Sequence, residues 1–415
     1  MVGAPEMSGS TALIVGSGAR EHALAWRLER EGVDVVVAPG NGGTPRPAGI
    51  ASSDVEGLVR YASAERFDLT VIGPEDPLAA GVVDAFQAAG LAVFGPTQAA
   101  ARLESSKAWA KEFFIRHGIP TGRAEVVDGA LAARRAVARM GLPVAIKADG
   151  LAAGKGVFIV DSWPAVDRAL ERCAAFGQRM LVEEYLTGPE LSVMAFVDGE
   201  RIGLMPPARD YKRLLDGDRG PNTGGMGGCT WPSYATRDLL DEVERCVLRA
   251  AVDGMNAEST PYHGVLYAGL MLTAIGPQVL EFNCRFGDPE CELIVPLLEC
   301  SLFETCQAVI EGRLQADDVR WRDARTYGVV LVAAGYPDAP RRGDAIHGLD
   351  TLPEGVMAFH GGTTLRDGQV VTAGGRVLTL VGDTREAVYA GAERVQFDGK
   401  QWRTDIGLEV AVAAR

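Results

Sequence analysis

The feature that most limits the fold of this chain is the alternation of short apolar strands and helical segments in its first hundred residues. Strands are predicted at 11–15, 33–38, 69–72 and 91–94, with a helical pattern at 21–31. The later strands each end in a turn rich in glycine or proline, and the first ends in Gly-Ser-Gly. This alternation predicts a parallel sheet with helices on both faces, where ligands gather beyond the carboxyl ends of the strands.

The first of these turns, residues 16–21, begins like a dinucleotide-binding loop but departs from that pattern. The third glycine of the pattern would fall at position 21, which is Glu21, and the second strand ends without an acid to hold a ribose hydroxyl. What remains is a glycine turn at a helix N-terminus, with Arg20 beside it. The turn is either an anion site for a phosphate-bearing substrate or a plain tight turn, and a dehydrogenase is disfavoured.

The chain changes character after residue 104. A helix at 106–117 precedes a compact series of strands and helices, which predicts a small α+β lid of roughly 60 residues. Beyond Tyr327 strands and turns dominate. We predict an N-terminal substrate-binding domain at 11–104, a second domain at 105–324 with its lid at about 121–186, and a C-terminal domain at 325–415.

Composition narrows the class of protein. The 415 residues include 41 Lys plus Arg against 55 Asp plus Glu, a net charge of −14, which argues against a general nucleic-acid binder. Seven cysteines without a CxxC pair indicate reduced thiols rather than disulfides or zinc. Residues 1–10 do not resemble a signal peptide, and no apolar run approaches membrane-spanning length. A cytoplasmic protein is expected.

The segment Val279-Leu280-Glu281-Phe282-Asn283-Cys284-Arg285 predicts a cation site at the end of a strand. Side chains alternate across a strand, so Glu281 and Asn283 should face the same side. Their oxygens suit a hard cation such as Mg²⁺, which shares its ligands with nucleotide phosphates. Arg285, two residues on, offers a planar charged fork for phosphate oxygens. The alternative is a strand end with solvated polar residues.

The glycine-rich loop between Lys147 and Val157 is not a Walker A loop. Three residues separate its first two glycines, and Gly156 stands where a metal-binding Ser or Thr would be. Strands on both sides predict a hairpin whose backbone N–H groups close over phosphates, with Lys155 adding charge. Lys147 should face the interior beside an anion, because an unpaired buried lysine is costly. The alternative is a surface hairpin without a ligand.

Three further segments carry weaker signals. Residues 181–186 leave a strand as a possible adenine slot, with Glu190 placed to accept hydrogen bonds from a ribose. Residues 209–213 and the glycine-rich loop at 221–228 could bind a carboxylate or phosphate. Solvated loops are the ordinary alternative for each of them.

Taken together, these segments resemble the ATP-grasp enzymes, and among them the phosphoribosylamine–glycine ligases, also called glycinamide ribonucleotide synthetases. The resemblance runs from Gly16 to about Gly407, and its motifs stand in the order GSGAREHALAW, APGNGGT, GPEDPLAAGVVD, LESSKAWAKEF, IKADGLAAGKGV, VEEYL, GPELS, DYKR, GPNTGGMG, GVLYAGLM, LEFNCRFGDPE, GDAIHGL and GGRVL. It implies an α/β protein with an ATP-grasp fold, preceded by a Rossmann-like parallel-sheet domain, with a small mobile lid and a mostly β C-terminal domain.

The resemblance also implies a reaction. Glycine would be ligated to 5-phosphoribosylamine through glycyl phosphate, giving glycinamide ribonucleotide, ADP and phosphate in de novo purine biosynthesis. ATP and Mg²⁺, or Mn²⁺, are the implied cofactors. The implied partners are these small molecules, with no nucleic acid or membrane, and the protein would be a monomer or weak homodimer. The alternatives are a paralogous carboxylate–amine ligase with a different amine or amino acid, and a nucleotide-binding regulatory module without catalysis.

By the same resemblance, individual residues receive roles. The implied catalytic residues are Arg285 and Lys155, and the implied metal ligands are Glu281 and Asn283. Those implied at ATP are Lys107, Lys147, Gly154, Lys155, Gly156, Glu183, Glu184, Tyr185, Leu186, Glu190 and Asn283. Those implied at the substrates are Gly16, Gly18, Arg20, Glu21, Asn41, Gly73, Pro74, Glu75, Asp210, Lys212, Asn222, Thr223, Gly224, Gly225, Met226, Gly227, Arg285, Gly287, Asp288 and Pro289.

The chain departs from the family's pattern at a few positions near the substrates. Where the family usually reads PETQ, this chain reads Pro289-Glu290-Cys291-Glu292, followed by Leu297 and Ser301 in place of a basic residue and an acid. After GGMG the family usually has Ala-Tyr, and here Gly228-Cys229 stand instead. These departures leave the nucleotide motifs intact and put the choice of amine or amino acid in doubt.

Overall fold

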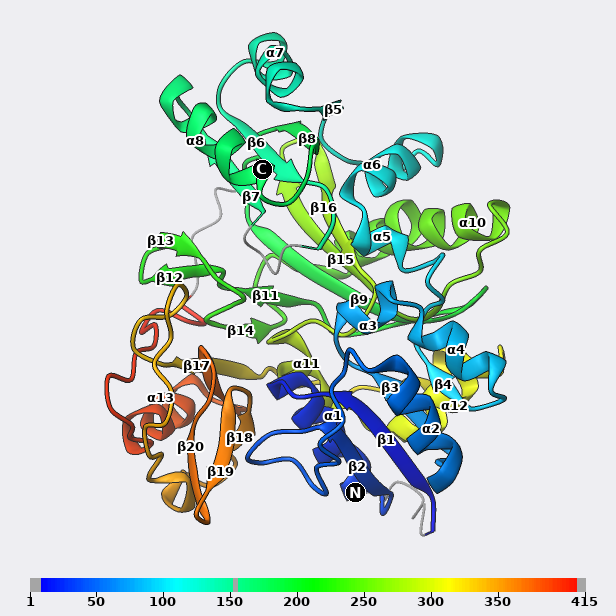
Figure 1. Ribbon diagram of the computed structural model, residues 1–415, viewed down its shortest axis with the longest axis vertical. Helices are drawn as coiled ribbons and strands as arrows, with labels where there is room; N and C mark the ends of the chain where they lie inside the picture. Colours follow the sequence, from blue (N-terminus) through cyan, green and yellow to red (C-terminus); the bar gives the residue numbers. More distant parts are fainter. Residues whose placement is uncertain (1–8, 152–155, 409–415) are drawn as a thin grey trace.

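The structure is a computed structural model that describes residues 9–151 and 156–408. Figure 1 shows the N-terminal parallel sheet at the bottom, a long central sheet across the middle and a small sheet with two helices at the top. The last strands of the chain lie beside the N-terminal sheet, at the lower left of the same view. The predicted α/β architecture with a mostly β C-terminal region is confirmed.

The N-terminal sheet is parallel, with the strand order β2-β1-β3-β4. Its strands are buried almost throughout, as expected when helices cover both faces. The elements are β1 (Thr11–Gly16), α1 (Ala19–Arg30), β2 (Asp34–Pro39), α2 (Val55–Glu65), β3 (Leu69–Ile72), α3 (Glu75–Ala79), α4 (Val82–Ala88) and β4 (Val93–Phe94). The carboxyl ends of β1, β2 and β3 therefore meet at one edge, where the predicted substrate turns lie.

The small sheet at the top of Figure 1 is antiparallel, in the order β5-β8-β6-β7. Helices α7 and α8 pack their apolar sides on it, in one cluster with β6 and β8. The elements are α5 (Arg102–Ser105), α6 (Lys107–Arg116), β5 (Ala124–Asp128), α7 (Ala130–Met140), β6 (Val144–Ala148), β7 (Val157–Val160), α8 (Trp163–Ala174) and β8 (Arg179–Glu184). The predicted lid thus has a core of its own.

The central sheet has the order β16-β15-β9-β11-β14-β17-β21-β18, with β10 paired to β9. Its strands are β9 (Glu190–Asp198), β10 (Ile202–Leu204), β11 (Ala208–Asp210), β14 (Gly227–Thr230), β15 (His263–Thr273), β16 (Gly276–Asn283), β17 (Tyr327–Val332), β18 (Met357–His360) and β21 (Arg376–Gly382). Strand β14 pairs with β17, so the sheet continues across the predicted boundary at residues 324–325. The C-terminal region is joined to the middle of the chain through backbone hydrogen bonds.

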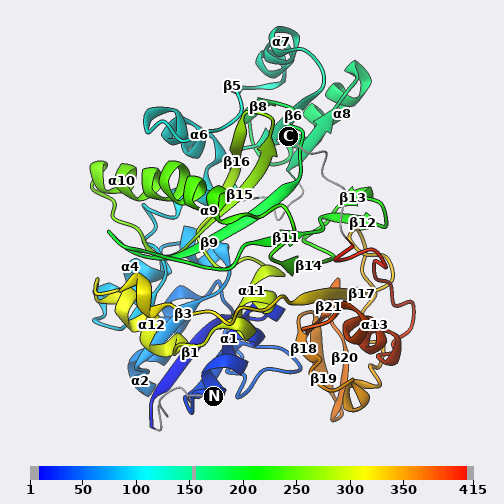
Figure 2. The same cartoon turned by 180° about the vertical axis from the view of Figure 1, so that it is seen from behind.

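Helices cover this sheet and connect its strands. The remaining elements are β12 (Arg213–Leu215), β13 (Arg219–Asn222), α9 (Arg237–Val243), a π-helical turn (Glu244–Leu248), α10 (Arg249–Ala257), α11 (Glu290–Ile294), α12 (Leu302–Ile310), β19 (Thr363–Arg366), β20 (Gln369–Thr372) and α13 (Arg385–Arg394), with 3₁₀ turns at Val295–Leu297, Ala316–Asp318 and Leu349–Thr351. Seen from behind, α10 runs along the central sheet and shares a hydrophobic cluster with β9 and β15 (Figure 2). Among the described residues, no helix is long and apolar enough to cross a membrane.

An aromatic cluster fixes the segment after β16 against the N-terminal sheet. Phe286 lies 6.4 Å from Phe94 of β4 and 5.8 Å from Phe196 of β9, measured between ring centroids. All three rings are buried in the cluster that joins the N-terminal and central sheets. Burying rings of this size contributes several kcal/mol in total. The polar residues on either side of Phe286 are held in place by this packing.

Candidate active site

The glycine turn after β1 is closed by a buried glutamate. The Glu21 carboxylate accepts hydrogen bonds from the backbone N–H of Gly18 at 2.5 Å and from Nε of Arg20 at 2.6 Å. A Cβ atom on Gly16 would lie 2.5 Å from Cδ of Glu21, and one on Gly73 would overlap the same carboxylate. Glycine is therefore needed at both positions to admit Glu21. The N–H group that a pyrophosphate would use is already bonded, which agrees with disfavouring a dinucleotide.

Arg285 ties the end of β16 to the N-terminal part of the chain. Its Nε lies 3.2 Å from Oε2 of Glu75, its Nη2 lies 2.9 Å from Oε1 of Glu104, and the same Nη2 donates to Oδ1 of Asn283 at 3.3 Å. Burial raises the pKa of Glu104 despite the nearby arginine. Burial acts in the same sense on Glu75, but Arg285 and Arg20 together lower the pKa of that carboxyl. The guanidinium is thus held in one orientation, as a phosphoryl-binding fork needs.

The cation site predicted from the sequence lies at the end of β16. We call this part of the strand, with Glu281 and Asn283, the cation end. Glu281 pairs with Gly269 of β15 in register, and Asn283 with Tyr267. Burial alone would raise the pKa of Glu281, but the charges of Lys212, Lys147 and Lys107 lower it, so the carboxylate is ionised. Within residues 9–151 and 156–408, no hydrogen bond or ion pair uses this carboxylate. An ionised oxygen donor without a partner, next to an amide oxygen, fits a hard divalent cation completed by phosphate oxygens.

Lys147 has the anion that the sequence predicts for it, namely Glu183. Glu183 of β8 forms ion pairs with Lys147 of β6 and, at 2.5 Å, with Lys111 of α6. All three side chains are buried. Burial raises the pKa of Glu183, but the two lysines reverse this effect and lower it. Lys147 also donates to the carbonyl of Leu280 at 3.1 Å, which links the small sheet to the cation end of β16.

The remaining residues predicted at the phosphates lie around the β6–β7 hairpin. Nζ of Lys107 donates to the carbonyl of Gly150 at 2.9 Å, and Asp149 accepts from Ala108 at the start of α6. The carbonyl of Gly156 accepts from Ala148 at 2.8 Å. Gly154 and Lys155 lie outside the described residues. The hairpin, the start of α6 and β16 therefore converge on one end of the molecule, although α6 ends at residue 116 and β16 begins only at residue 276.

The residues predicted at adenine and ribose follow β8. Glu184 is paired with Arg123 at 3.0 Å, and Tyr185 is exposed. Glu190 lies 3.3 Å from Nζ of Lys212, measured from Oε2. The Glu190 charge, aided by Tyr267, raises the pKa of Lys212 well above its usual range despite burial. Two residues predicted separately, one at ribose and one at the substrates, are thus brought together.

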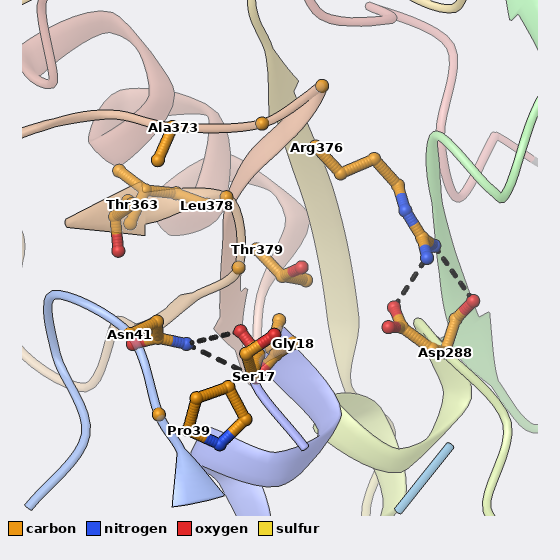
Figure 3. Close-up of a pocket in the computed structure, with 16 residues that line it drawn as sticks. Ser17, Gly18, Pro39, Asn41, Asp288, Thr363, Ala373, Arg376, Leu378 and Thr379 are labelled. Atoms are coloured by element: carbon orange, nitrogen blue, oxygen red, sulfur yellow. Dashed lines mark hydrogen bonds and ion pairs between the residues drawn. The ribbon is translucent and has the colours of Figure 1, made fainter. Parts of the chain in front are cut away.

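A pocket of about 480 Å³ opens between the N-terminal sheet and the C-terminal strands. Figure 3 shows Ser17, Gly18 and Asn41 on one side, with Arg376 and Asp288 facing each other on the other. Nη1 of Arg376 lies 3.0 Å from Oδ1 of Asp288. The lining residues are Ser17, Gly18, Ala19, Pro39, Gly40, Asn41, Asp288, Gly361, Gly362, Thr363, Ala373, Gly374, Gly375, Arg376, Leu378 and Thr379. Of the residues predicted at the substrates, Gly18, Asn41 and Asp288 line this pocket.

The predicted loop at 222–227 folds over the segment that follows β16. Thr223 bonds to the carbonyl of Lys212 through both its N–H and its hydroxyl. Gly225 has a φ of +114°, and a Cβ atom there would lie 2.6 Å from Cδ of Pro289 and 2.8 Å from Oδ1 of Asp210. Only glycine permits this close approach. The loop therefore brings Asp210, Lys212 and Pro289 together.

A contact between His22, which is partly buried, and His360, which is buried, joins α1 to the C-terminal strands. Nδ1 of His22 accepts from the backbone N–H of His360 at 2.8 Å, and Asn41 donates to the His360 carbonyl at 2.6 Å. Burial, with the neighbouring His360, lowers the pKa of His22 to about 3, and burial lowers the pKa of His360 to about 4. Both rings are therefore neutral at pH 7.

The contact between His22 and His360 predicts that the folded protein loses stability in acid. A histidine in the unfolded chain has a pKa of about 6.5. Below that pH the unfolded chain therefore binds protons that the folded chain does not bind, and acid favours unfolding. Between pH 7 and pH 5, His22 alone should lower the free energy of unfolding by roughly 2 kcal/mol. Urea unfolding of wild type and His22→Asn, which keeps an acceptor but does not titrate, should show a shallower pH dependence for the variant. The exposed His347→Asn is the control, and equal slopes for wild type and His22→Asn would refute the assignment.

Comparison with known proteins identifies the family to which this site belongs. Three models of phosphoribosylglycinamide synthetase match along the chain: the N domain at residues 10–104, the ATP-grasp (A) domain at 105–291 and the C domain at 326–409. The chain belongs to the phosphoribosylglycinamide synthetase family. The family expected from the ordered motifs is therefore confirmed.

Members of the synthetase family are similar over nearly their whole length. The phosphoribosylamine–glycine ligase of Ralstonia nicotianae is 47% identical, with 95% of this chain and 98% of that protein covered. The crystal structure of the Thermotoga maritima phosphoribosylamine–glycine ligase is 38% identical, with a TM-score of 0.84 over 96% of this chain and 100% of that one. The biotin carboxylase domain of the Hydrogenobacter thermophilus 2-oxoglutarate carboxylase, 15% identical with a TM-score of 0.75, covers 94% of this chain and 91% of its own, and shares the fold alone.

Three side chains of the site escaped the sequence analysis of this family member. Glu104 and Lys111 belong to a quoted motif, LESSKAWAKEF, and Arg376 to another, GGRVL. None received a role, because their partners lie far away in sequence: Glu104 meets Arg285, Lys111 meets Glu183, and Arg376 meets Asp288. No local signal marks these side chains, because α5 and α6 carry several other charged residues and Arg376 is the first residue of β21.

Most departures from the synthetase pattern lie in the interior. Cys229, Cys291 and Leu297 are buried, and Cys291 belongs to the hydrophobic cluster between the N-terminal and central sheets. Ser301 is the N-cap of α12, because its hydroxyl accepts from the backbone N–H of Glu304 at 3.1 Å, and the same hydroxyl donates to Oε2 of Glu31 at 2.7 Å. Glu292 is fully buried, and neither of its carboxylate oxygens has a hydrogen-bond partner among the described residues. Burial, with Asp288 nearby, raises the pKa of Glu292 well above its usual range.

Proposed function

We propose that this chain ligates glycine to 5-phosphoribosylamine at the expense of ATP, through glycyl phosphate. The observation that carries the proposal is the short segment 281–288. It runs from the cation end at Glu281 and Asn283, through Arg285, to Asp288 on the pocket wall. An acyl phosphate is hydrolysed by water, so the group that forms it and the amine that consumes it must lie close together. The relatives named phosphoribosylamine–glycine ligase support this assignment.

The first step is phosphoryl transfer. An oxygen of the glycine carboxylate attacks the γ-phosphorus of ATP, and the bond to the ADP oxygen breaks. No base is needed, because the carboxylate is already ionised. Catalysis rests on positioning and on positive charge around the phosphoryl group. We assign this charge to Lys107 and Lys147 with the Gly154-Lys155-Gly156 loop, and to Arg285, whose orientation is fixed by Glu75 and Glu104.

A divalent cation belongs at Glu281 and Asn283. We propose Mg²⁺ or Mn²⁺, held by these two side chains, and it supplies charge neutralisation at the phosphates. Adenine is assigned to residues 183–186 and the ribose of ATP to Glu190. Because the Glu183 carboxylate is held by two lysines, its contribution to adenine binding comes from the backbone.

The second step is acyl transfer. The amine of phosphoribosylamine attacks the acyl carbon, the bond to the phosphate oxygen breaks, and a proton leaves the nitrogen for water. We assign the 480 Å³ pocket to phosphoribosylamine, because backbone N–H groups of its glycine-rich walls suit a phosphate and Asn41 and Asp288 suit hydroxyl groups. The other residues assigned to the substrates are Gly16, Gly18, Arg20, Glu21, Gly73, Pro74, Glu75, Asp210, Lys212, 222–227, Gly287 and Pro289.

An assay with all three substrates tests this function. ADP release should require glycine and phosphoribosylamine together and should fall to background when either is omitted. Mass spectrometry should then find glycinamide ribonucleotide. Turnover that needs a different amine or amino acid, and none with this pair, would favour the paralogous ligase instead.

A further inference from the structure

Glu292 is a buried acid for which the proposed reaction has no use. It lies in α11 with no exposed surface, and neither oxygen of its carboxyl group has a hydrogen-bond partner among the described residues. Its neighbours Cys291 and Leu293 are buried as well. An ionised carboxylate is costly in such surroundings, so the group either pairs with a cation or takes up a proton.

The cation closest in its effect on Glu292 belongs to another acid. The charge of Arg376 acts on Glu292, but the guanidinium is bound to Asp288 (Figure 3). Nη1 of Arg376 lies 3.0 Å from Oδ1 of Asp288 and donates to the carbonyls of Asp288 and Gly224 at 2.9 and 2.5 Å. One guanidinium neutralises one carboxylate, and here that carboxylate is Asp288.

The guanidinium groups that α1 and β11 place beside α11 have partners of their own. Arg20 of α1 pairs with Glu21 at 2.6 Å, and Arg209 of β11 lies 3.7 Å from Asp218. Other titratable groups on α11 and on the elements packed against it carry no positive charge, namely Glu290, Cys291, Asp210 of β11, Cys229 of β14 and Tyr327 of β17. A proton is therefore what remains for Glu292.

The group that can accept a hydrogen bond from this proton is the carboxylate of Asp288, four residues earlier in the chain. Two ionised carboxylates can only accept hydrogen bonds and repel each other, whereas one proton between them makes a bond. Burial, with the charge of Asp288, accordingly raises the pKa of Glu292 well above its usual range. With Arg376 charged and one of the two acids protonated, the three side chains together are neutral.

We propose that Glu292 is a positioning residue that stays protonated and donates a hydrogen bond to Asp288, which fixes the Asp288 carboxylate on the pocket wall. The inference rests on the proposed function, which assigns this pocket to phosphoribosylamine. Asp288 lines the pocket and Glu292 does not, so Glu292 acts through Asp288. Held by Arg376 and by Glu292, the carboxylate keeps one orientation, in which it accepts from a hydroxyl of the substrate.

Infrared spectroscopy of the whole protein in heavy water tests for the proton without any turnover. At neutral pH, the difference between the spectra of wild type and Glu292→Gln should contain the carbonyl band of a protonated carboxylic acid, because the substitution removes that group. Glu31→Gln is the matched control. Glu31 is also buried, but it pairs with Arg27 at 2.8 Å and accepts from the N–H of Leu302 at 2.7 Å, so its substitution should remove only a carboxylate band.

The KM for phosphoribosylamine tests the positioning. Glu292→Met keeps the length of the side chain but cannot donate, and it should raise this KM about tenfold, the effect of losing a hydrogen bond to a charged group. Glu292→Gln donates through its amide and should stay within about threefold of wild type. The KM values for ATP and glycine should change by less than about threefold in both variants. In an Asp288→Asn background, Glu292→Met should have no further effect, because the group that it positions is already changed.

Absence of the acid band, or equal KM values for phosphoribosylamine in Glu292→Met and wild type, overturns the inference. An additive effect in the Asp288→Asn background also overturns it, because Glu292 would then act through packing alone. If Glu292→Met does not fold, the infrared band and the KM of Glu292→Gln decide. Absence of turnover with phosphoribosylamine in wild type would count against the proposed function, and the infrared result would still report the proton.

Discussion

Glu281→Ala is expected to lower the rate of ADP formation by on the order of a thousandfold, the effect of losing a metal ligand from a phosphoryl-transfer site. The reason lies in the surroundings of the carboxylate. It is ionised by the charges of Lys212, Lys147 and Lys107, yet it forms no hydrogen bond or ion pair with any described residue. A charged group held in this way is what the proposed metal site requires.

The same surroundings predict that the Glu281→Ala protein stays folded. Lys147 keeps Glu183 and Lys212 keeps Glu190, so neither lysine is left without an anion. The thermal midpoint should therefore move by only a few degrees. Titration of ADP release with Mg²⁺ and with Mn²⁺ measures the effect, and Glu281→Gln separates loss of charge from loss of volume. A rate within tenfold of wild type at saturating metal would contradict the metal assignment.

The strands and helices could be predicted from local sequence pattern, because neighbouring residues determine where each of them begins and ends. Alternating apolar strands and glycine turns predicted the parallel sheet, and the predicted strand at 69–72 matches β3 to the residue. The cost of an unpaired buried lysine correctly demanded an anion near Lys147. Such predictions need only sequence neighbours and a general penalty.

Which distant residues meet in the site could not be predicted from local pattern. Arg285 meets Glu75 and Glu104 across 210 and 181 residues, and Arg376 meets Asp288 across 88. These contacts depend on how the N-terminal sheet packs on the central sheet, through the aromatic cluster around Phe286, and on the pairing of β14 with β17 within the central sheet. Periodicity describes the faces of single elements and carries no information about which faces meet. The resemblance to a family, taken from ordered motifs, assigned Arg285, Glu75 and Asp288 to one site but gave Glu104 and Arg376 no role.

Glu183 shows both what the local sequence pattern could predict and what it could not. Its motif, VEEYL, suggested a nucleotide hinge, whereas the structure uses its carboxylate to hold two lysines from different elements. The ion pairs of Glu183 with Lys111 and Lys147 therefore link the small sheet to α6. The hydrogen bond from Lys147 to the Leu280 carbonyl links them in turn to the cation end of β16. A carboxylate in this position acts on stability and on ATP binding together.

Glu183→Ala is accordingly expected to destabilise the small sheet by about 3–5 kcal/mol, the usual result of removing one partner from a buried ion pair. Lys111 and Lys147 would remain buried, at 3% and 7% exposure, without the carboxylate that forms ion pairs with both of them. Because the small sheet has a hydrophobic core of its own, hydrogen exchange of β6 and β8 is the measurement that reports its stability directly. The KM for ATP should rise in parallel, since Lys147 would lose its fixed position.

The neighbouring residue provides the matched control for this prediction. Glu184 is half-buried and pairs with Arg123, whose side chain is exposed, so Glu184→Ala should change local stability by less than about 1 kcal/mol. The pH dependence should differ as well. Because the lysines lower the pKa of Glu183, its contribution is present at neutral pH and is lost as the pH falls below about 4.5, where the unfolded carboxyl takes up its proton first. Equal protection of β6 and β8 in both variants would show that the ion pairs of Glu183 contribute no net stability, and that the two lysines are stabilised in some other way.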